Sequence, residues 1–177
     1  MSEQSELLQL VQNTVNAADT GTVKLSSVIR SCIRIARLRN DFVSLLWLQR
    51  ELIDNQNEFE RRRVFSEIIP HFTKDQFNHF NKLFVEMWMQ ERPAIAFEDG
   101  RIEKIDMIIG KNVSELENEL KGMIDTYNRA QTPAGMHPFD TAKLEEQNFH
   151  LRVQTQAYIN HYQKILESIK NRVYDFL

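Results

Sequence analysis

Apolar residues recur at intervals of three and four positions through most of the chain, which is the spacing of an α-helix that buries one face. The first such stretch begins at Leu7 and stops near Gly21, a second occupies residues 28–36, and a third occupies residues 42–53. Few glycines (5) and prolines (4) interrupt the chain. The pattern predicts a succession of helices joined by short breaks.

Two later helices carry explicit start signals. Thr73 with Gln76, and Asn112 with Glu115, each form the residue pair of a capping box, in which each side chain accepts a hydrogen bond from the backbone of the other. Pro70 marks the end of the preceding helix. The first box opens a stretch whose apolar residues share one stripe: Phe77, Phe80, Phe84, Met87 and Trp88.

The segment between residues 92 and 109 supports two interpretations. Asp99-Gly100 lies between short apolar runs, which is a signal for a two-residue hairpin turn. The isoleucines of the same segment also fit helical spacing. The sequence therefore leaves open a short β-hairpin near residues 95–105 and a further helix.

The end of the chain has the longest uninterrupted pattern. A loop is predicted at residues 131–140, which contain two prolines and a glycine, and neither residue type occurs from Thr141 to Leu177. A helix of that length spans roughly 55 Å at about 1.5 Å per residue. A compact chain of this size is only roughly 32–35 Å across. The helix is therefore expected either to kink or to project from the domain.

Composition supports a single globular domain over residues 1–177. Hydrophobic residues make up 42% and charged residues 27%, close to ordinary globular usage, and a chain of this length can bury a sizeable core. The predicted fold is all-α, a multi-helix bundle with a long C-terminal helix.

Residue usage excludes several classes of protein. Cys32 is the only cysteine, which excludes an internal disulfide and fits a reducing cytosol. The first ten residues carry acids where a signal peptide needs bases. No apolar run approaches the roughly 20 residues that span a bilayer. We expect a cytoplasmic protein without membrane segments.

No sequence motif identifies a reaction. The chain lacks a glycine-rich phosphate loop, a zinc-binding H-x-E or C-x-x-C pattern and a G-x-S-x-G nucleophile elbow. His150 and His161 share a helix face but lie roughly 16 Å apart, too far for one ion to bridge them. We expect no catalytic, cofactor-binding or metal-binding residues. An enzyme with a dispersed active site remains an alternative, because such a site leaves no local motif.

One group of basic residues in this chain of formal net charge −3 lacks acidic neighbours. Arg30, Arg34 and Arg37 recur at helical intervals opposite an apolar face, with no acid between Gly21 and Asn40. Arginine suits both phosphate binding and interface ion pairs. We favour a structural or protein-facing role because the acids elsewhere oppose broad attraction to nucleic acid.

A second basic cluster, Arg61–Arg63, is surrounded by acids. Arg62 lies four residues after Glu58, and Arg63 lies four residues before Glu67, a spacing that suits ion pairs within one helix. We interpret this cluster as a solvated helix face.

Two blocks of sequence, residues 21–53 and 165–176, carry a further signal. The residues concerned in the first block are Leu25, Ser26, Ser27, Val28, Ile29, Arg30, Trp47, Leu48, Glu51 and Leu52, and those in the second are Ile165, Leu166, Ile169, Arg172, Val173, Asp175 and Phe176. They resemble the "LSSLLRK", "WLxxELxGY" and "ILxxIRxRVLDFxLxLE" motifs of the AbiTii domain, a helical module of bacterial abortive-infection and anti-phage genes. The chain departs from the family at Asp54-Asn55, where the family has "GY", and in its aromatic rather than proline-rich centre.

The resemblance implies an interaction or assembly module of a bacterial anti-phage system, and the family offers no catalytic residues to carry over. The partner would be another copy of the chain, or a neighbouring effector or NTPase. The alternative from a different class is a nucleic-acid-binding sensor that uses the arginine stripe.

The long C-terminal helix is the predicted assembly element. Its residues Leu144, Leu151, Tyr158 and Ile165 recur every seven positions, which is typical of a seam that buries against another helix. Its last residues are strongly apolar and are therefore expected to pack against another surface. We expect a homo-oligomer or a complex subunit, with the helix packed partly on its own domain and partly on a partner. The candidate interaction residues on this helix are Tyr158, Ile165, Val173 and Phe176.

If the arginine stripe is structural or protein-facing, the purified protein will show no salt-dependent binding to DNA or RNA at physiological ionic strength, as measured by fluorescence anisotropy. Binding below micromolar concentration that weakens steeply with salt, and that Arg30→Glu with Arg34→Glu abolishes, would support the sensor instead.

Overall fold

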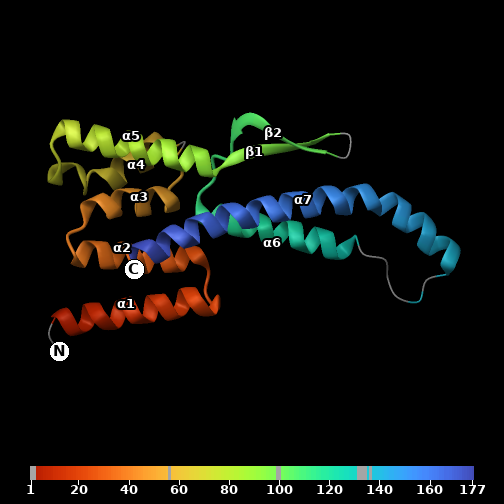
Figure 1. Ribbon diagram of the computed structural model, residues 1–177, viewed down its shortest axis with the longest axis horizontal. Helices are drawn as coiled ribbons and strands as arrows, with labels where there is room; N and C mark the ends of the chain where they lie inside the picture. Colours follow the sequence, from red (N-terminus) through yellow and green to blue (C-terminus); the bar gives the residue numbers. More distant parts are fainter. Residues whose placement is uncertain (1–2, 56, 99–100, 131–134, 136) are drawn as a thin grey trace.

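The computed structural model of the chain describes residues 3–55, 57–98, 101–130, 135 and 137–177. Its elements in chain order are α1 (Glu3–Thr20), α2 (Leu25–Leu38), α3 (Phe42–Leu52), α4 (Glu58–Phe65), the 3₁₀ helix η1 (Ile69–His71), α5 (Lys74–Glu91), β1 (Pro93–Glu98), β2 (Arg101–Ile108), α6 (Val113–Arg129) and α7 (Pro138–Phe176). The prediction of an all-α bundle with a long C-terminal helix is confirmed, and of the two alternatives for the central segment the short hairpin is present (Figure 1).

Helices α1 to α5 lie one above another at one end of the molecule, which we call the body (Figure 1). The apolar face of α2 forms its centre, where Ile29, Cys32 and Ala36 are fully buried. The turn to α3 depends on Asn40, whose φ of 53° lies in the left-handed region that asparagine tolerates better than most residues. The next residue, Asp41, then caps α3 by accepting the backbone N–H of Ser44 at 2.9 Å.

Helix α7 is one 39-residue helix that belongs to two parts of the molecule. Its C-terminal half packs on the body, and its N-terminal half runs beside α6 and then extends beyond it (Figure 1). The helix therefore projects, as one of the two alternatives predicted. It begins at Pro138 rather than Thr141, and the rest of the loop predicted at residues 131–140 lies largely outside the described residues.

The segment that the sequence left ambiguous is a β-hairpin. β1 and β2 pair antiparallel, with Phe97 opposite Ile102 and Ile95 opposite Lys104. β2 contains three isoleucines, and β-branched side chains suit a strand. The predicted turn at Asp99-Gly100 lies outside the described residues. We call the hairpin, α6 and residues 138–160 of α7 the arm.

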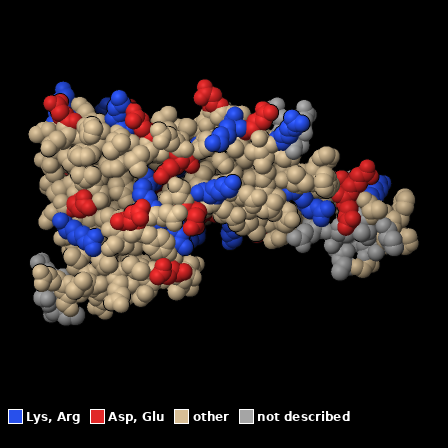
Figure 2. All heavy atoms as spheres, in the orientation of Figure 1, with Lys and Arg blue, Asp and Glu red and all other residues tan. Residues whose placement is uncertain are grey.

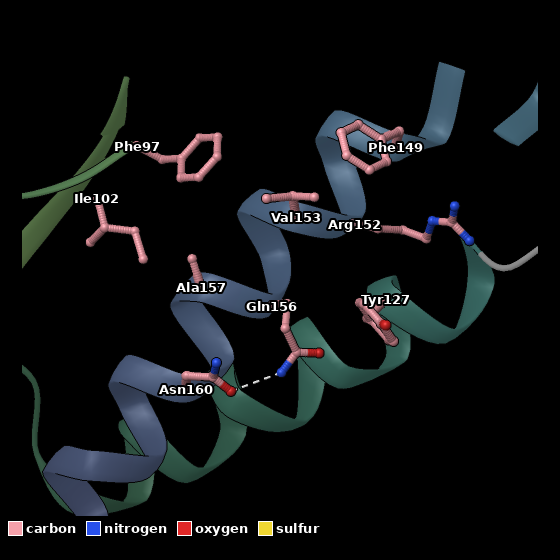
Figure 3. A pocket seen from close by; sticks show the side chains of 9 residues that line it. All are labelled: Phe97, Ile102, Tyr127, Phe149, Arg152, Val153, Gln156, Ala157 and Asn160. Atoms are coloured by element: carbon pink, nitrogen blue, oxygen red, sulfur yellow. Dashed lines mark hydrogen bonds between the residues drawn. The ribbon is translucent and has the colours of Figure 1, made fainter. Parts of the chain in front are cut away.

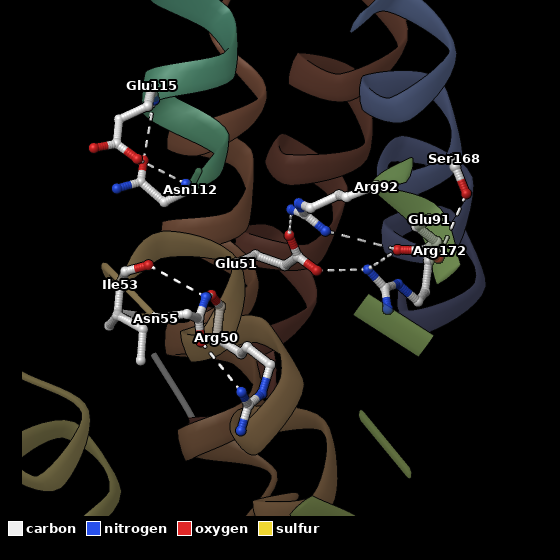
Figure 4. Close-up of polar contacts among 10 residues, drawn as sticks. All are labelled: Arg50, Glu51, Ile53, Asn55, Glu91, Arg92, Asn112, Glu115, Ser168 and Arg172. Carbon is white, nitrogen blue, oxygen red and sulfur yellow. Dashed lines mark hydrogen bonds and ion pairs between the residues drawn. The ribbon is translucent and has the colours of Figure 1, made fainter. Parts of the chain in front are cut away.

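A buried charge cluster joins the body to α7 (Figure 4). Glu51 on α3 is 1% exposed and accepts hydrogen bonds from Arg92, at the end of α5, and from Arg172 on α7 at 2.6 Å. Arg172 also forms an ion pair with Glu91 at 2.9 Å, and Ser168 donates a hydrogen bond to Glu91 at 3.4 Å. Burial raises the pKa of Glu91 above its ordinary value. One carboxylate thus connects three elements that are distant in sequence.

Aromatic faces cover both arginines of this cluster. The Arg92 guanidinium lies 4.5 Å from the ring centre of Trp88, and that of Arg172 lies 4.8 Å from Trp47. The ring of Phe176, at the end of α7, meets Trp47 edge-on with centroids 6.4 Å apart. These contacts stabilise the cations through the electron-rich ring faces and hold the C-terminal turn of α7 on the body.

Glu51→Gln tests how much the cluster stabilises the fold. The change removes the charge that both guanidinium groups face, so we expect the free energy of unfolding in urea to fall by about 3–5 kcal/mol. Glu58→Gln is the matched control, because it breaks an exposed ion pair with Arg62 and should cost at most about 1 kcal/mol. Equal losses for the two variants would contradict a special role for the buried cluster.

Candidate protein-binding groove

A groove with a volume of about 580 Å³ lies in the arm. It lies between the hairpin and α7, with α6 at its far side (Figure 3). We call it the arm groove, and the residues that line it are Phe97, Ile102, Tyr127, Phe149, Arg152, Val153, Gln156, Ala157 and Asn160.

The hairpin is fixed to α7 at one end of the arm groove. The ring of His161 lies 2.6 Å from the carbonyl oxygen of Pro93, at the first residue of β1. The backbone N–H of Ile109 donates to the carbonyl of Arg92 at 2.8 Å and closes the base of the hairpin. From this base the side chains of Phe97 and Ile102 point toward α7 (Figure 3). The groove is therefore the opening between two elements that are joined at one end.

The opposite wall of the groove depends on the packing of α6 against α7. The hydroxyl of Tyr162 donates to Glu119 at 2.7 Å, and Lys111 forms an ion pair with the same carboxylate. Burial of the ring and the neighbouring Glu119 raise the pKa of Tyr162 above its ordinary value. Burial also acts to raise the pKa of Glu119, but the hydrogen bonds from Lys111 and Tyr162 outweigh it and lower that pKa. The acid is therefore ionised at neutral pH and fixes the two helices together.

The lining is apolar along its length and polar at one side. Phe149 and Ile102 are each 55% exposed and Val153 is 39% exposed, large fractions for side chains of this kind. The one charged lining residue is Arg152, which makes no hydrogen bond or ion pair with any described residue. Nearby, the Gln156 amide donates to Asn160 at 2.8 Å. The described part of the groove therefore combines uncovered apolar surface with the unpaired cation of Arg152.

The arginine stripe lies on the body, away from the arm groove. Arg37 donates two hydrogen bonds of 2.7 Å to Glu67, and the hydrogen bond lowers the pKa of Glu67. Arg30 and Arg34 are exposed and make no ion pair with a described residue. On the face that Figure 2 shows, basic and acidic side chains are interspersed over the body and the arm. The structure thus leaves two of the three predicted arginines free.

The second basic cluster, Arg61–Arg63, forms one of its two predicted ion pairs. Arg62 forms the predicted ion pair with Glu58 at 2.5 Å. The predicted pair of Arg63 with Glu67 does not form: α4 ends at Phe65, before Glu67, and Arg37 of α2 binds that carboxylate instead.

The candidate residues at the end of α7 need a correction. Ile165 is 2% exposed and Val173 is fully buried, so both belong to the core of this chain and neither is available to a partner. Phe176 is half-buried against Trp47 and Arg39. Tyr158 is half-buried between α6 and α7, at the edge of a smaller hollow. The apolar end of α7 is therefore packed within this chain, since α7 lies against α2 and its Phe176 contacts Trp47 of α3.

The sequence did not lead us to predict the residues that line the arm groove. Phe149, Val153 and Ala157 recur every four positions and form a second apolar stripe on α7, on a different side from the seven-residue seam. That stripe was visible in the sequence. Its partners Phe97 and Ile102 were not, because their position depends on the hairpin, which the sequence left as one of two alternatives.

Neither a metal-binding cluster nor a similar protein indicates what the arm groove binds. No group of three or more potential metal-binding side chains occurs among the described residues. Within the same residues, no helix is both long and apolar enough to cross a membrane. No family model, curated protein or solved structure matches the chain.

Aspartate substitutions distinguish the two halves of α7. Ile165→Asp places an unpaired charge in the core and should lower the free energy of unfolding by at least about 3 kcal/mol in urea denaturation. Phe149→Asp faces solvent in the arm groove and should change it by no more than about 0.5 kcal/mol. A large loss for Phe149→Asp would mean that the groove wall is part of the core.

Proposed function

We propose that this chain is a non-enzymatic interaction module that binds another protein through the arm groove. The observation that carries the proposal is the exposure of Phe149, Val153 and Ile102 on facing walls outside the core. Contiguous apolar surface of this kind is typical of binding sites. Among the described residues, the lining contains one charged residue, Arg152, and no acid–base pair of the sort that proton-transfer catalysis requires.

The resemblance to the AbiTii domain supports a place for this module in a bacterial anti-phage system. Trp47 and Glu51 of the first resembling block contact Phe176 and Arg172 of the second block. The two blocks therefore pack against each other although more than 100 residues separate them in the sequence. This contact supports their interpretation as one structural motif that holds the body together. The partner would be another copy of the chain, or an effector or NTPase encoded beside it.

A nucleic-acid-binding sensor is the second candidate, and the free guanidinium groups of Arg30 and Arg34 favour it. Two cations give limited affinity, because nucleic-acid binding at physiological salt needs several phosphate contacts. The third member of the stripe, Arg37, is already neutralised by Glu67. We therefore rank this function below protein binding.

Coexpression with the products of the neighbouring genes tests the proposed function. We expect light scattering after size-exclusion chromatography to show either a complex with one of them or an oligomer of this chain. Phe149→Asp with Val153→Asp should abolish the association, because the charges prevent burial of the groove. Phe59→Asp is the control, since Phe59 is 77% exposed on α4 of the body.

Three outcomes would contradict the proposal. The chain could remain a monomer with every neighbouring product, or the groove variant could associate as well as the control. Loss of association in Arg30→Glu with Arg34→Glu alone would move the function to the arginine stripe.

A further inference from the structure

We infer that the occupant of the arm groove is an amphipathic α-helix of a partner protein, with an acidic side chain that binds Arg152. This inference rests on the proposed function and adds the chemistry of the partner. Three properties of the groove support it: its length, the direction of its walls and its isolated cation.

The length of the groove matches a helix of about three turns. On α7 the lining runs from Phe149 to Asn160, a distance of roughly 16 Å at about 1.5 Å per residue. Phe149, Val153 and Ala157 form one row along this wall, in which Phe149 and Val153 are exposed and Ala157 is buried. A partner helix with apolar residues at positions i, i+3 or i+4, and i+7 covers the same distance.

The walls offer side chains rather than backbone groups. Phe97 and Ile102 are directly opposite each other across the hairpin, so both project from one face of the sheet, and that face is turned to α7 (Figure 3). A strand or extended peptide between these walls would leave its N–H and C=O groups unpaired against apolar carbon. A helix pairs its backbone groups internally and needs only side-chain contacts.

The free edge of the hairpin is a poor alternative docking site. In the described residues the sheet has two strands, so β2 has an unpaired edge. The register between the strands shifts between Pro93 and Ile95, and β2 carries Arg101, Glu103, Lys104 and Asp106 along its length. Irregular pairing and charged side chains are the usual protection of an edge against a further strand. Strand addition is therefore disfavoured here.

Arg152 determines the charge of the partner. Its side chain lines the groove and extends toward the end of α6 (Figure 3), and its guanidinium makes no ion pair with a described residue. Covering it with an apolar or basic helix would desolvate a cation without compensation. An Asp or Glu beside the apolar stripe of the partner can accept a bidentate hydrogen bond from it, which is the strong form of such a pair.

An unbiased selection on the full-length protein tests the inference. A yeast-displayed library of random 18-residue segments is sorted for binding to the fluorescently labelled chain, and Phe149→Asp with Val153→Asp serves as the counter-selection. We expect the enriched segments to have apolar residues at helical spacing with a neighbouring Asp or Glu. Proline in the middle of a selected segment should abolish its binding.

Charge reversal provides the decisive comparison. For a selected segment, replacing its acid by Lys should weaken binding to the unchanged protein at least about tenfold, which corresponds to about 1.4 kcal/mol. Arg152→Glu should reverse this preference, and Arg63→Glu, an exposed arginine on α4, should leave it unchanged.

Several results would overturn the inference. These are no enrichment over the counter-selection, enriched segments with extended or basic patterns, or a preference for acid that survives Arg152→Glu. Dimerisation of the isolated chain through Phe149 would identify the occupant as a second copy instead. If coexpressed proteins still require Phe149 and Val153 while the selection fails, the proposed function stands and only the chemistry of the occupant is wrong.

Discussion

The structure depends on the placement of one carboxylate, that of Glu51, in the interior. Burying a single charge is unfavourable, and it becomes tolerable here because two guanidinium groups approach it from different elements. The chain can satisfy Glu51 only when the end of α5 and the last turns of α7 both reach α3. The cluster therefore selects one arrangement of helices from the many that apolar stripes alone would permit.

This requirement divides α7 into two parts with different surroundings. Residues such as Ile169 and Arg172 are committed to the core and its charge cluster, whereas Phe149 and Val153 remain uncovered on the arm. Because the helix is continuous, the body holds the wall of the arm groove in position before any partner arrives. A partner that binds there needs to order only its own side chains and backbone, which lowers the entropic cost of association.

The helices were predictable because their signals are local. The stripe on α2 and the capping boxes at Thr73 and Asn112 each depend on residues within a few positions of one another. The arm groove was not predictable, because Phe97 and Phe149 come to line one groove only through the course of the hairpin relative to α7. The pairing of Arg37 with Glu67 instead of Arg63 has the same origin, since spacing within one helix gives no information about the neighbouring element. Apolarity at Ile165 correctly indicated burial, but it could not reveal whether the covering surface belonged to this chain or to another.

The burial of Cys32 at the centre of α2 has a practical consequence. Desolvation raises the pKa of this thiol to about 12, so almost none of it is present as the reactive thiolate at neutral pH. It is also the only sulfhydryl in the chain. Alkylating reagents will therefore label Cys32 only when the interior of the protein opens. The rate at which the wild-type chain is labelled thus reports how often its core unfolds. A cysteine introduced at an exposed position on the arm would be labelled far faster than Cys32.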